Sequence, residues 1–289
     1  MQLFAVDKKN RIISAAQAPK KTDYFCRECG GIVRLRGGVY KKNHFFHLAS
    51  QSACRQSQKS AAHLQVQYFL EKILSIEQCS LERYFPEIGR IADVAWEDEK
   101  IIFEVQCSSI SKEEVENRNR DYQTLGYQVV WILHDKRFNR WKVSAAESFL
   151  RTSPYYYTNM DSLGNGEIYD QIDTIQGGVR RVYKKLFNVQ LNQMKKCVKK
   201  ETDIKTKTAS ILELRRAFWP LHFHNDLIDK WMCLDSDIEA ALLKAFQYEN
   251  STYKQILSPI VKFFRHFFSF VFLRPYLLLF RILLEKACR

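Results

Sequence analysis

Glycine and proline are scarce in this chain, with 10 and 6 copies among its 289 residues. Flexible and extended linkers are rich in these two residues, so their scarcity argues against long disordered segments. The first fifteen residues lack the basic, apolar and small-residue sections of a secretory leader. No internal repeat or low-complexity tract is evident. We therefore expect compact domains, without a leader, in the cytoplasm.

Long uncharged apolar runs are also missing. In the most apolar part, the tail at residues 258–289, the longest uncharged run covers residues 267–273, whereas a membrane span needs roughly 20 residues. Three arginines and one proline interrupt the tail: Arg265, Arg274, Pro275 and Arg281. We expect two packed helices that close a C-terminal helical domain. The alternative is an amphipathic segment that makes a peripheral contact with an anionic membrane.

Basic residues and apolar residues are plentiful. The chain has 45 Lys and Arg against 32 Asp and Glu, a formal net charge of +13, and 46% of its residues are hydrophobic. Residues 184–289 hold 19 of the basic and 10 of the acidic residues, so most of the excess is C-terminal. A basic surplus favours phosphate polyanions or anionic membranes as partners. A generically basic protein without such a partner is the alternative.

Three of the eight cysteines cluster near the N-terminus, at Cys26, Cys29 and Cys54, and two histidines, His44 and His47, lie between them. A CxxC turn aims two sulfurs at one point, and structural zinc takes four tetrahedral N or S ligands. The predicted ligands are Cys26, Cys29, His47 and Cys54, with His44 as the alternate. A redox CxxC is disfavoured because no βαβ unit surrounds it. The five scattered cysteines suggest thiols in a reducing compartment.

Basic side chains surround this predicted zinc module. Residues 32–39 suggest a hairpin that carries Arg34 and Arg36, and Lys41 and Lys42 follow it. We expect these four residues to contact the DNA backbone. Charges that simply face water are the alternative.

The central stretch, residues 90–133, suggests strand, turn, strand, helix, strand. Asp93 interrupts the first apolar strand, and Glu104 and Gln106 share one face of the second because they are two residues apart. A buried carboxylate pair is costly unless a cation neutralises it. Asp93 and Glu104 are therefore predicted ligands of Mg²⁺ or Mn²⁺. An exposed strand face is the alternative, and the flanking apolar runs disfavour it.

Two predicted helices flank these strands. Residues 57–76 form the first and carry His63 near its start, and residues 78–84 form a strand after it. In the second, which begins after Ser111, Arg118 and Tyr122 follow Glu114 at four-residue steps and share its face. Arg118 is in position to reach a phosphate, and Tyr122 to stack or donate a hydrogen bond. A solvated Glu–Arg pair is the alternative.

Pro86-Glu87, Asp93 and Glu104-Val105-Gln106 resemble the pattern of the PD-(D/E)xK nuclease superfamily. The departure is Gln106, because the common pattern has a lysine that orients or activates the attacking water. Glutamine can hydrogen-bond a water or a phosphate but carries no charge, so the resemblance leaves catalysis itself open.

A longer set of motifs resembles the competence protein CoiA family over about the first half of the chain. FCRECGGIVRLRGG and HFFH carry it near the N-terminus, followed by the Arg90-x-x-Asp93 step, FEVQCSSIS, the Arg118–Tyr122 spacing and YQVVWIL. The resemblance implies a histidine at His63 that touches phosphate or the metal-bound water. It also implies a role in recombining imported DNA during natural transformation, with a recombinase or other transformation proteins as partners.

The predicted fold is α/β. A zinc-ribbon-like module (residues 1–56) precedes a restriction-endonuclease-like core (57–152) and a mainly helical C-terminal region (153–289). The predicted function is metal-dependent hydrolysis of single- or double-stranded DNA. Asp93 and Glu104 hold the metal, Gln106 positions the water and Arg118 stabilises phosphate charge. The alternative is an inactive nuclease fold that grips DNA or a recombinase, and a weaker third is a membrane-associated scaffold.

Overall fold

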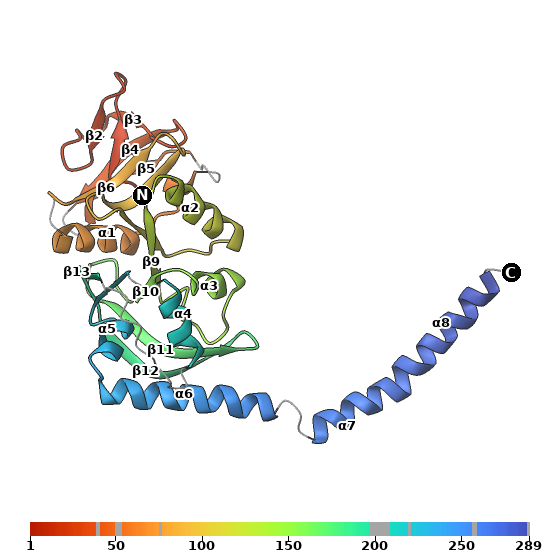
Figure 1. The fold of residues 1–289 in the computed structure, drawn as a ribbon. Helices are drawn as coiled ribbons and strands as arrows, with labels where there is room; N and C mark the ends of the chain where they lie inside the picture. Colours follow the sequence, from red (N-terminus) through yellow and green to blue (C-terminus); the bar gives the residue numbers. More distant parts are fainter. Residues whose placement is uncertain are drawn as a thin grey trace.

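A computed structural model describes residues 1–38, 41–49, 54–74, 77–196, 209–218, 221–255 and 259–287 of the chain. Two sheets follow one another from the N-terminus, and helices are concentrated toward the C-terminus (Figure 1). This arrangement confirms the predicted α/β fold class.

The N-terminal module is a five-stranded antiparallel sheet with strand order β2-β1-β3-β4-β5. Its strands are β1 (Phe4–Val6), β2 (Ile12–Ser14), β3 (Asp23–Phe25), β4 (Ile32–Gly38) and β5 (Lys41–His47). Strand β4 alternates as a half-buried strand should: Val33 and Leu35 are buried while Arg34 and Arg36 are exposed. Tyr24 and Phe45 pack edge to face, with ring centroids 5.1 Å apart, in the small core beneath.

The central sheet has seven strands in the order β12-β11-β10-β9-β8-β7-β6. They are β6 (Cys79–Phe85), β7 (Arg90–Trp96), β8 (Ile101–Gln106), β9 (Gln128–His134), β10 (Tyr155–Thr158), β11 (Ile168–Gln176) and β12 (Val179–Asn188). Strand β9 is parallel to both of its neighbours, β8 and β10, and the other pairs are antiparallel. The continuous apolar run at residues 128–133 therefore forms a central parallel strand that is buried on both faces of the sheet.

Helices cover both faces of this sheet. The short helix η1 (Arg55–Gln58) leads into α1 (Ala61–Leu74), which packs on β6, β7 and β8. Helix α2 (Lys112–Thr124) packs on β9 and on α3 (Ala145–Leu150). The Ser111 hydroxyl accepts a hydrogen bond from the Glu114 amide at 3.1 Å, so Ser111 is the N-cap of α2, which begins after it as expected.

The sheet continues beyond the predicted boundary at residues 152/153, which falls between α3 and β10. Strands β13 (Gln190–Lys196) and β14 (Leu221–His224) form a separate pair, and β13 packs on α1. Helices α4 (Ser210–Ala217), α5 (Leu227–Met232) and α6 (Ser236–Gln255) share an apolar core with β11 and β12. Division of the chain into independent domains at the predicted bounds stays a prediction.

The tail is one helical rod that extends away from the other elements in Figure 1. It comprises α7 (Pro259–Phe268), a π turn (Ser269–Leu273) and α8 (Arg274–Ala287). Its apolar side chains between residues 263 and 280 are exposed, in contrast to the packed pair of helices that we expected. Within the described ranges, no helix combines the length and apolar character that crossing a bilayer requires.

Candidate active site and metal centre

A cavity of about 420 Å³ opens where strands β7 and β8 meet the start of α1 and one face of α2. All six residues with predicted catalytic roles line it: His63, Asp93, Glu104, Gln106, Arg118 and Tyr122. The two predicted metal carboxylates therefore line one space. The catalytic roles themselves stay predictions.

Asp93 sits where strands β7 and β8 separate. Their ladder includes the pair Val94–Phe103, and at the next step the Asp93 carboxylate accepts the Val105 N–H at 2.9 Å. The other carboxylate oxygen lies 2.9 Å from His63 Nε2 and 2.9 Å from Lys59 Nζ. Burial opposes ionisation of Asp93, but His63 and Lys59 outweigh it and hold the pKa of Asp93 well below its usual range.

Lys59 and Glu82 are functional candidates that the sequence analysis missed. Lys59 lines the cavity and bridges two carboxylates, with its Nζ 2.9 Å from Asp93 and 3.0 Å from Glu82. Burial lowers the pKa of Lys59, but the charges of Asp93 and Glu82 outweigh it, so the ammonium stays charged. Glu82 has a backbone φ of +45° within β6, a strained conformation for a residue other than glycine.

Glu104 is buried beside the cavity and holds the face of α2 against β8. Its carboxylate lies 2.6 Å from Arg118 Nη1 and accepts the Tyr122 hydroxyl at 2.9 Å. Burial raises the pKa of Glu104, Arg118 lowers it and the nearby charge of Asp93 raises it again, with a net upward shift. Arg118 also lies 2.9 Å from Glu114, its predicted neighbour one turn earlier. Arg118 is therefore held by two carboxylates and is not free in solvent.

Gln106 ends strand β8 and points into the same cavity. Its amide nitrogen donates to the Ser108 carbonyl at 2.8 Å and to the Ser108 hydroxyl at 3.2 Å. This loop contact fixes the side chain, so its carbonyl oxygen is the atom that remains for a water or a metal ion.

The donor set suits a hard divalent cation. Asp93, Glu104 and Gln106 supply oxygen atoms, which Mg²⁺ and Mn²⁺ prefer. The carboxylates are at present balanced by protein cations, so a metal ion would share them with Lys59 and Arg118. Glu87 of the PD-like pair lies instead in the β6–β7 turn and lines a different surface hollow.

Two more arginines border the cavity and were not predicted as site residues. Arg90 lies 2.8 Å from Asp121 and 2.7 Å from Glu114. Arg55, from η1, lies 2.5 Å from Glu28. No periodic sequence pattern distinguishes either arginine from those on the surface. Only the fold places both of them at the cavity.

The predicted DNA-binding residues of the N-terminal module lie away from the cavity. Arg34 is exposed but pairs with Asp23 at 2.5 Å, and Arg36 covers the Phe46 ring. Lys42 Nζ lies 3.8 Å from the centre of the Tyr68 ring on α1. Lys41 begins β5, and its side chain lies outside the part that the structure describes. Contact of these residues with DNA stays a prediction.

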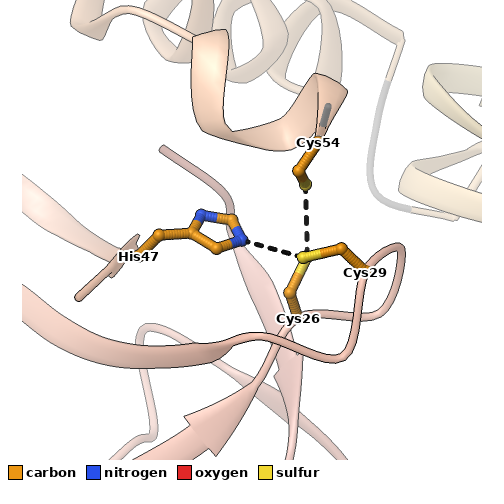
Figure 2. Close-up of side chains that lie close together, drawn as sticks. All are labelled: Cys26, Cys29, His47 and Cys54. Atoms are coloured by element: carbon orange, nitrogen blue, oxygen red, sulfur yellow. Dashed lines mark hydrogen bonds between the residues drawn. The ribbon is translucent and has the colours of Figure 1, made fainter. Parts of the chain in front are cut away.

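The Cys/His cluster forms as the spacing predicts. Ligand atoms of Cys26, Cys29, His47 and Cys54 all lie within 4.8 Å of one another (Figure 2). Cys26 and Cys54 sulfurs are 3.7 Å apart, close to the roughly 3.8 Å between two sulfurs of one tetrahedral zinc site. His44 instead places its Nδ1 2.9 Å from the Lys42 carbonyl. The cluster can therefore hold a structural metal with these four residues.

The CxxC turn is arranged for thiolates. The Glu28 and Gly31 amides point at the Cys26 and Cys29 sulfurs, each at 3.4 Å, and Gly30 has a φ of +68°, which glycine adopts without strain. Burial raises the thiol pKa values of Cys26 and Cys54. Without a metal these two sulfurs hold their protons, so metal uptake must release them.

One short segment of the chain, residues 54–59, connects the Cys/His cluster to the cavity. Cys54 is followed directly by Arg55, which lines the cavity, and Lys59 lies one turn further on. Glu28, inside the CxxC turn, binds Arg55 and accepts the Gln56 amide at 3.2 Å. The Cys/His cluster therefore positions one wall of the cavity.

Residues 59–163 match the family model described as "Competence protein CoiA, nuclease-like domain". The competence protein CoiA of Bacillus subtilis (strain 168) is 27% identical over 146 residues, which cover 49% of this chain and 38% of that protein. No solved structure matches significantly. The matched domain begins at Lys59 and contains all six predicted catalytic residues.

Proposed function

We propose that this chain, whose residues 59–163 match the CoiA nuclease-like domain family, is a metal-dependent DNA nuclease of the PD-(D/E)xK type. The family match and the similarity to the Bacillus subtilis protein support the resemblance to CoiA that the sequence motifs carry. Because the match covers 38% of the curated relative, the activity, substrate and partners of the whole protein are part of the proposal.

One observation carries the proposal. Two carboxylates from neighbouring strands, Asp93 and Glu104, line one polar cavity together with Gln106 and basic side chains. Carboxylates that hold a cation, beside basic groups that attract phosphate, are what hydrolysis of a phosphodiester needs. The partner implied by this charge pattern and by the +13 net charge is DNA.

Each residue has a defined role in this proposal. Asp93 and Glu104 hold Mg²⁺ or Mn²⁺, and the ion supplies Lewis acidity and a more acidic bound water. The Gln106 oxygen orients the attacking water. Lys59, already charged beside Asp93, supplies the positive charge that a lysine at position 106 would otherwise bring. Arg118 and Arg90 stabilise charge that develops on the phosphate.

His63 and Tyr122 act on the carboxylates in this scheme. His63 Nε2 lies 2.9 Å from the Asp93 carboxylate, within hydrogen-bond distance, and burial lowers the pKa of the imidazole although Asp93 opposes this. The Tyr122 hydroxyl donates to Glu104. In this proposal both side chains orient the metal ligands, in place of the contact with phosphate or metal-bound water that the family resemblance implies for His63.

A second candidate is a nuclease fold that binds DNA or a recombinase without cutting. The absence of lysine at position 106 and the internal pairing of both carboxylates with Lys59, His63 and Arg118 favour it. Incubation of circular and linear DNA with Mg²⁺ or Mn²⁺ separates the two candidates. Cleavage that Asp93→Asn removes, with DNA binding retained, supports the enzyme. Binding without cleavage under every metal condition supports the second candidate.

The cellular setting follows from the relative's printed name, a competence protein. We place the protein in the cytoplasm, where it acts on imported DNA during natural transformation with a recombinase or other transformation proteins. The six free cysteines among the described residues are consistent with a reducing compartment.

A further inference from the structure

The tail helix exposes a large apolar surface. All large apolar side chains that the structure describes between residues 263 and 280, thirteen in number, are between 40% and 68% exposed. Monomeric soluble proteins rarely leave a continuous apolar patch of this kind uncovered, so it marks an interaction surface. Neither the nuclease cavity nor the metal cluster lies on this helix.

A polar row follows the same helix, and the π turn keeps it in line. His266 and Ser269 are three residues apart, Arg274 follows Ser269 after five, and Arg281 follows Arg274 after seven, or two turns. In a regular α-helix, a step of five residues from Ser269 would place Arg274 outside this row. It coincides with the π turn, in which the Arg274 amide bonds the Ser269 carbonyl, because a π turn takes one residue more than an α turn.

Pro275 fits the same arrangement. Proline lacks the amide that an α-helix needs in its interior, and here it follows directly on the turn where the hydrogen-bond pattern already changes. The helix therefore continues through the proline, with phenylalanine and leucine on most of its circumference and a narrow polar row along one side.

We infer that the helix at residues 259–287 lies in the headgroup region of an anionic membrane, with its apolar side in the lipid and its polar row in water. Helices with aromatic and leucine side chains opposite a basic row bind membranes in this way. Residues 259–287 contain five Lys and Arg against one Glu, and anionic lipids attract such a surplus. The inference does not depend on the proposed nuclease activity.

A lipid surface suits the helix better than a second copy of the chain. Two tails that paired through their apolar sides would leave each basic row facing water, with a single acidic residue in each tail to offset it. Anionic lipids neutralise the row instead, and they cover apolar side chains on a wider arc than one partner helix does. The helix lies at the membrane surface and does not cross the bilayer, because its arginines interrupt every apolar run.

The test is flotation of the full chain with lipid vesicles. Vesicles of phosphatidylglycerol and phosphatidylcholine should carry the protein, and vesicles of phosphatidylcholine alone should carry much less. Phe263 and Phe267 stack one turn apart with ring centroids 6.2 Å apart, so F263S/F267S should weaken binding at least tenfold. Trp141→Ser, at an exposed residue outside the tail, is the matched control and should bind as the native chain does.

The charge contribution is tested with Arg274→Gln and Arg281→Gln together. This variant should lose the preference for anionic over neutral vesicles, and added salt should weaken native binding. Flotation that is unchanged in F263S/F267S overturns the inference. So does a native chain that fails to float while light scattering shows a dimer that F263S/F267S abolishes.

Discussion

The Lys59 ammonium lies 2.9 Å from the Asp93 carboxylate, and both side chains are almost fully buried at the wall of the cavity. Lys59 comes from the segment before α1, whereas the common PD-(D/E)xK pattern places its lysine two residues after the glutamate. Glu82, 3.0 Å away, holds the ammonium from the other side. A positive charge is thus present beside the first carboxylate although position 106 is glutamine.

Lys59→Met keeps the length of the side chain but removes its charge. The substitution leaves the negative charges of Asp93 and Glu82 less neutralised. Breaking a buried ion pair lowers the free energy of unfolding by about 3 kcal/mol or more. We expect a lower free energy of unfolding in urea and at least a 100-fold slower cleavage of DNA. Lys72→Met, at an exposed lysine of α1, is the control. Native-like cleavage by Lys59→Met would remove Lys59 from the mechanism.

The pKa of Asp93 lies well below its usual range, and this predicts how stability depends on pH. A carboxyl group whose folded pKa is depressed contributes stability above its unfolded pKa, about 3.9. That contribution is lost as the pH falls below about 4 toward the folded pKa. The native chain should therefore exceed Asp93→Asn in unfolding free energy at pH 6, and the gap should narrow toward pH 2. A gap that is constant with pH contradicts the ion pair.

Much of this site could be predicted from spacing alone. Asp93, Glu104 and Gln106 are polar residues inside otherwise apolar strands, and the Cys/His spacing specified the metal cluster. Lys59 and Glu82 were missed because their positions depend on irregular backbone: a turn before α1 and a positive φ within β6. The regular spacings of helices and strands therefore do not predict where the side chains of Lys59 and Glu82 lie.

The C-terminal strands were missed for another physical reason. Strand β11 contains Asp170 and Asp173, two acidic residues that interrupt its apolar pattern. In the fold both are buried and paired, Asp170 with Arg215 and Asp173 with Arg180 and Arg151. These arginines come from other elements, so the compensation is invisible locally. Tyr155–Thr158, which the sequence analysis included in the mainly helical region, is a buried strand parallel to β9.

Zinc should be present at about one ion per chain in purified protein, measured by elemental analysis. Cys26→Ser should lose the ion and unfold more easily, because the four ligands tie the CxxC turn to Cys54. Cys233→Ser, at an exposed free cysteine, should keep it. Zinc binding by the apo-protein should also release protons, measured by calorimetry in buffers of different ionisation enthalpy. Metal-free protein that is fully folded would contradict a structural role.

DNA affinity should fall steeply with rising salt because each neutralised phosphate releases counterion. The contacts of the basic residues in the N-terminal module indicate which of them should contribute more to DNA binding. Arg36→Gln should lower the salt slope by about one unit. Arg34→Gln should change it less, because Asp23 already offsets the charge of Arg34. Affinities measured by fluorescence anisotropy across a salt series check both slopes, and equal slopes for all three proteins exclude this hairpin from the DNA contact.

The central claim is that Asp93 and Glu104 hold the metal of a nuclease. It is tested most directly by DNA cleavage with Mg²⁺, with Mn²⁺ and with EDTA, using the native chain, Asp93→Asn and Asp98→Asn. Asp98 is an exposed aspartate in the β7–β8 turn and serves as the matched control. The account predicts metal-dependent cleavage by the native chain and by Asp98→Asn, and at least a 100-fold loss in Asp93→Asn with DNA binding retained. Cleavage that persists in Asp93→Asn, or that EDTA leaves unchanged, would contradict it.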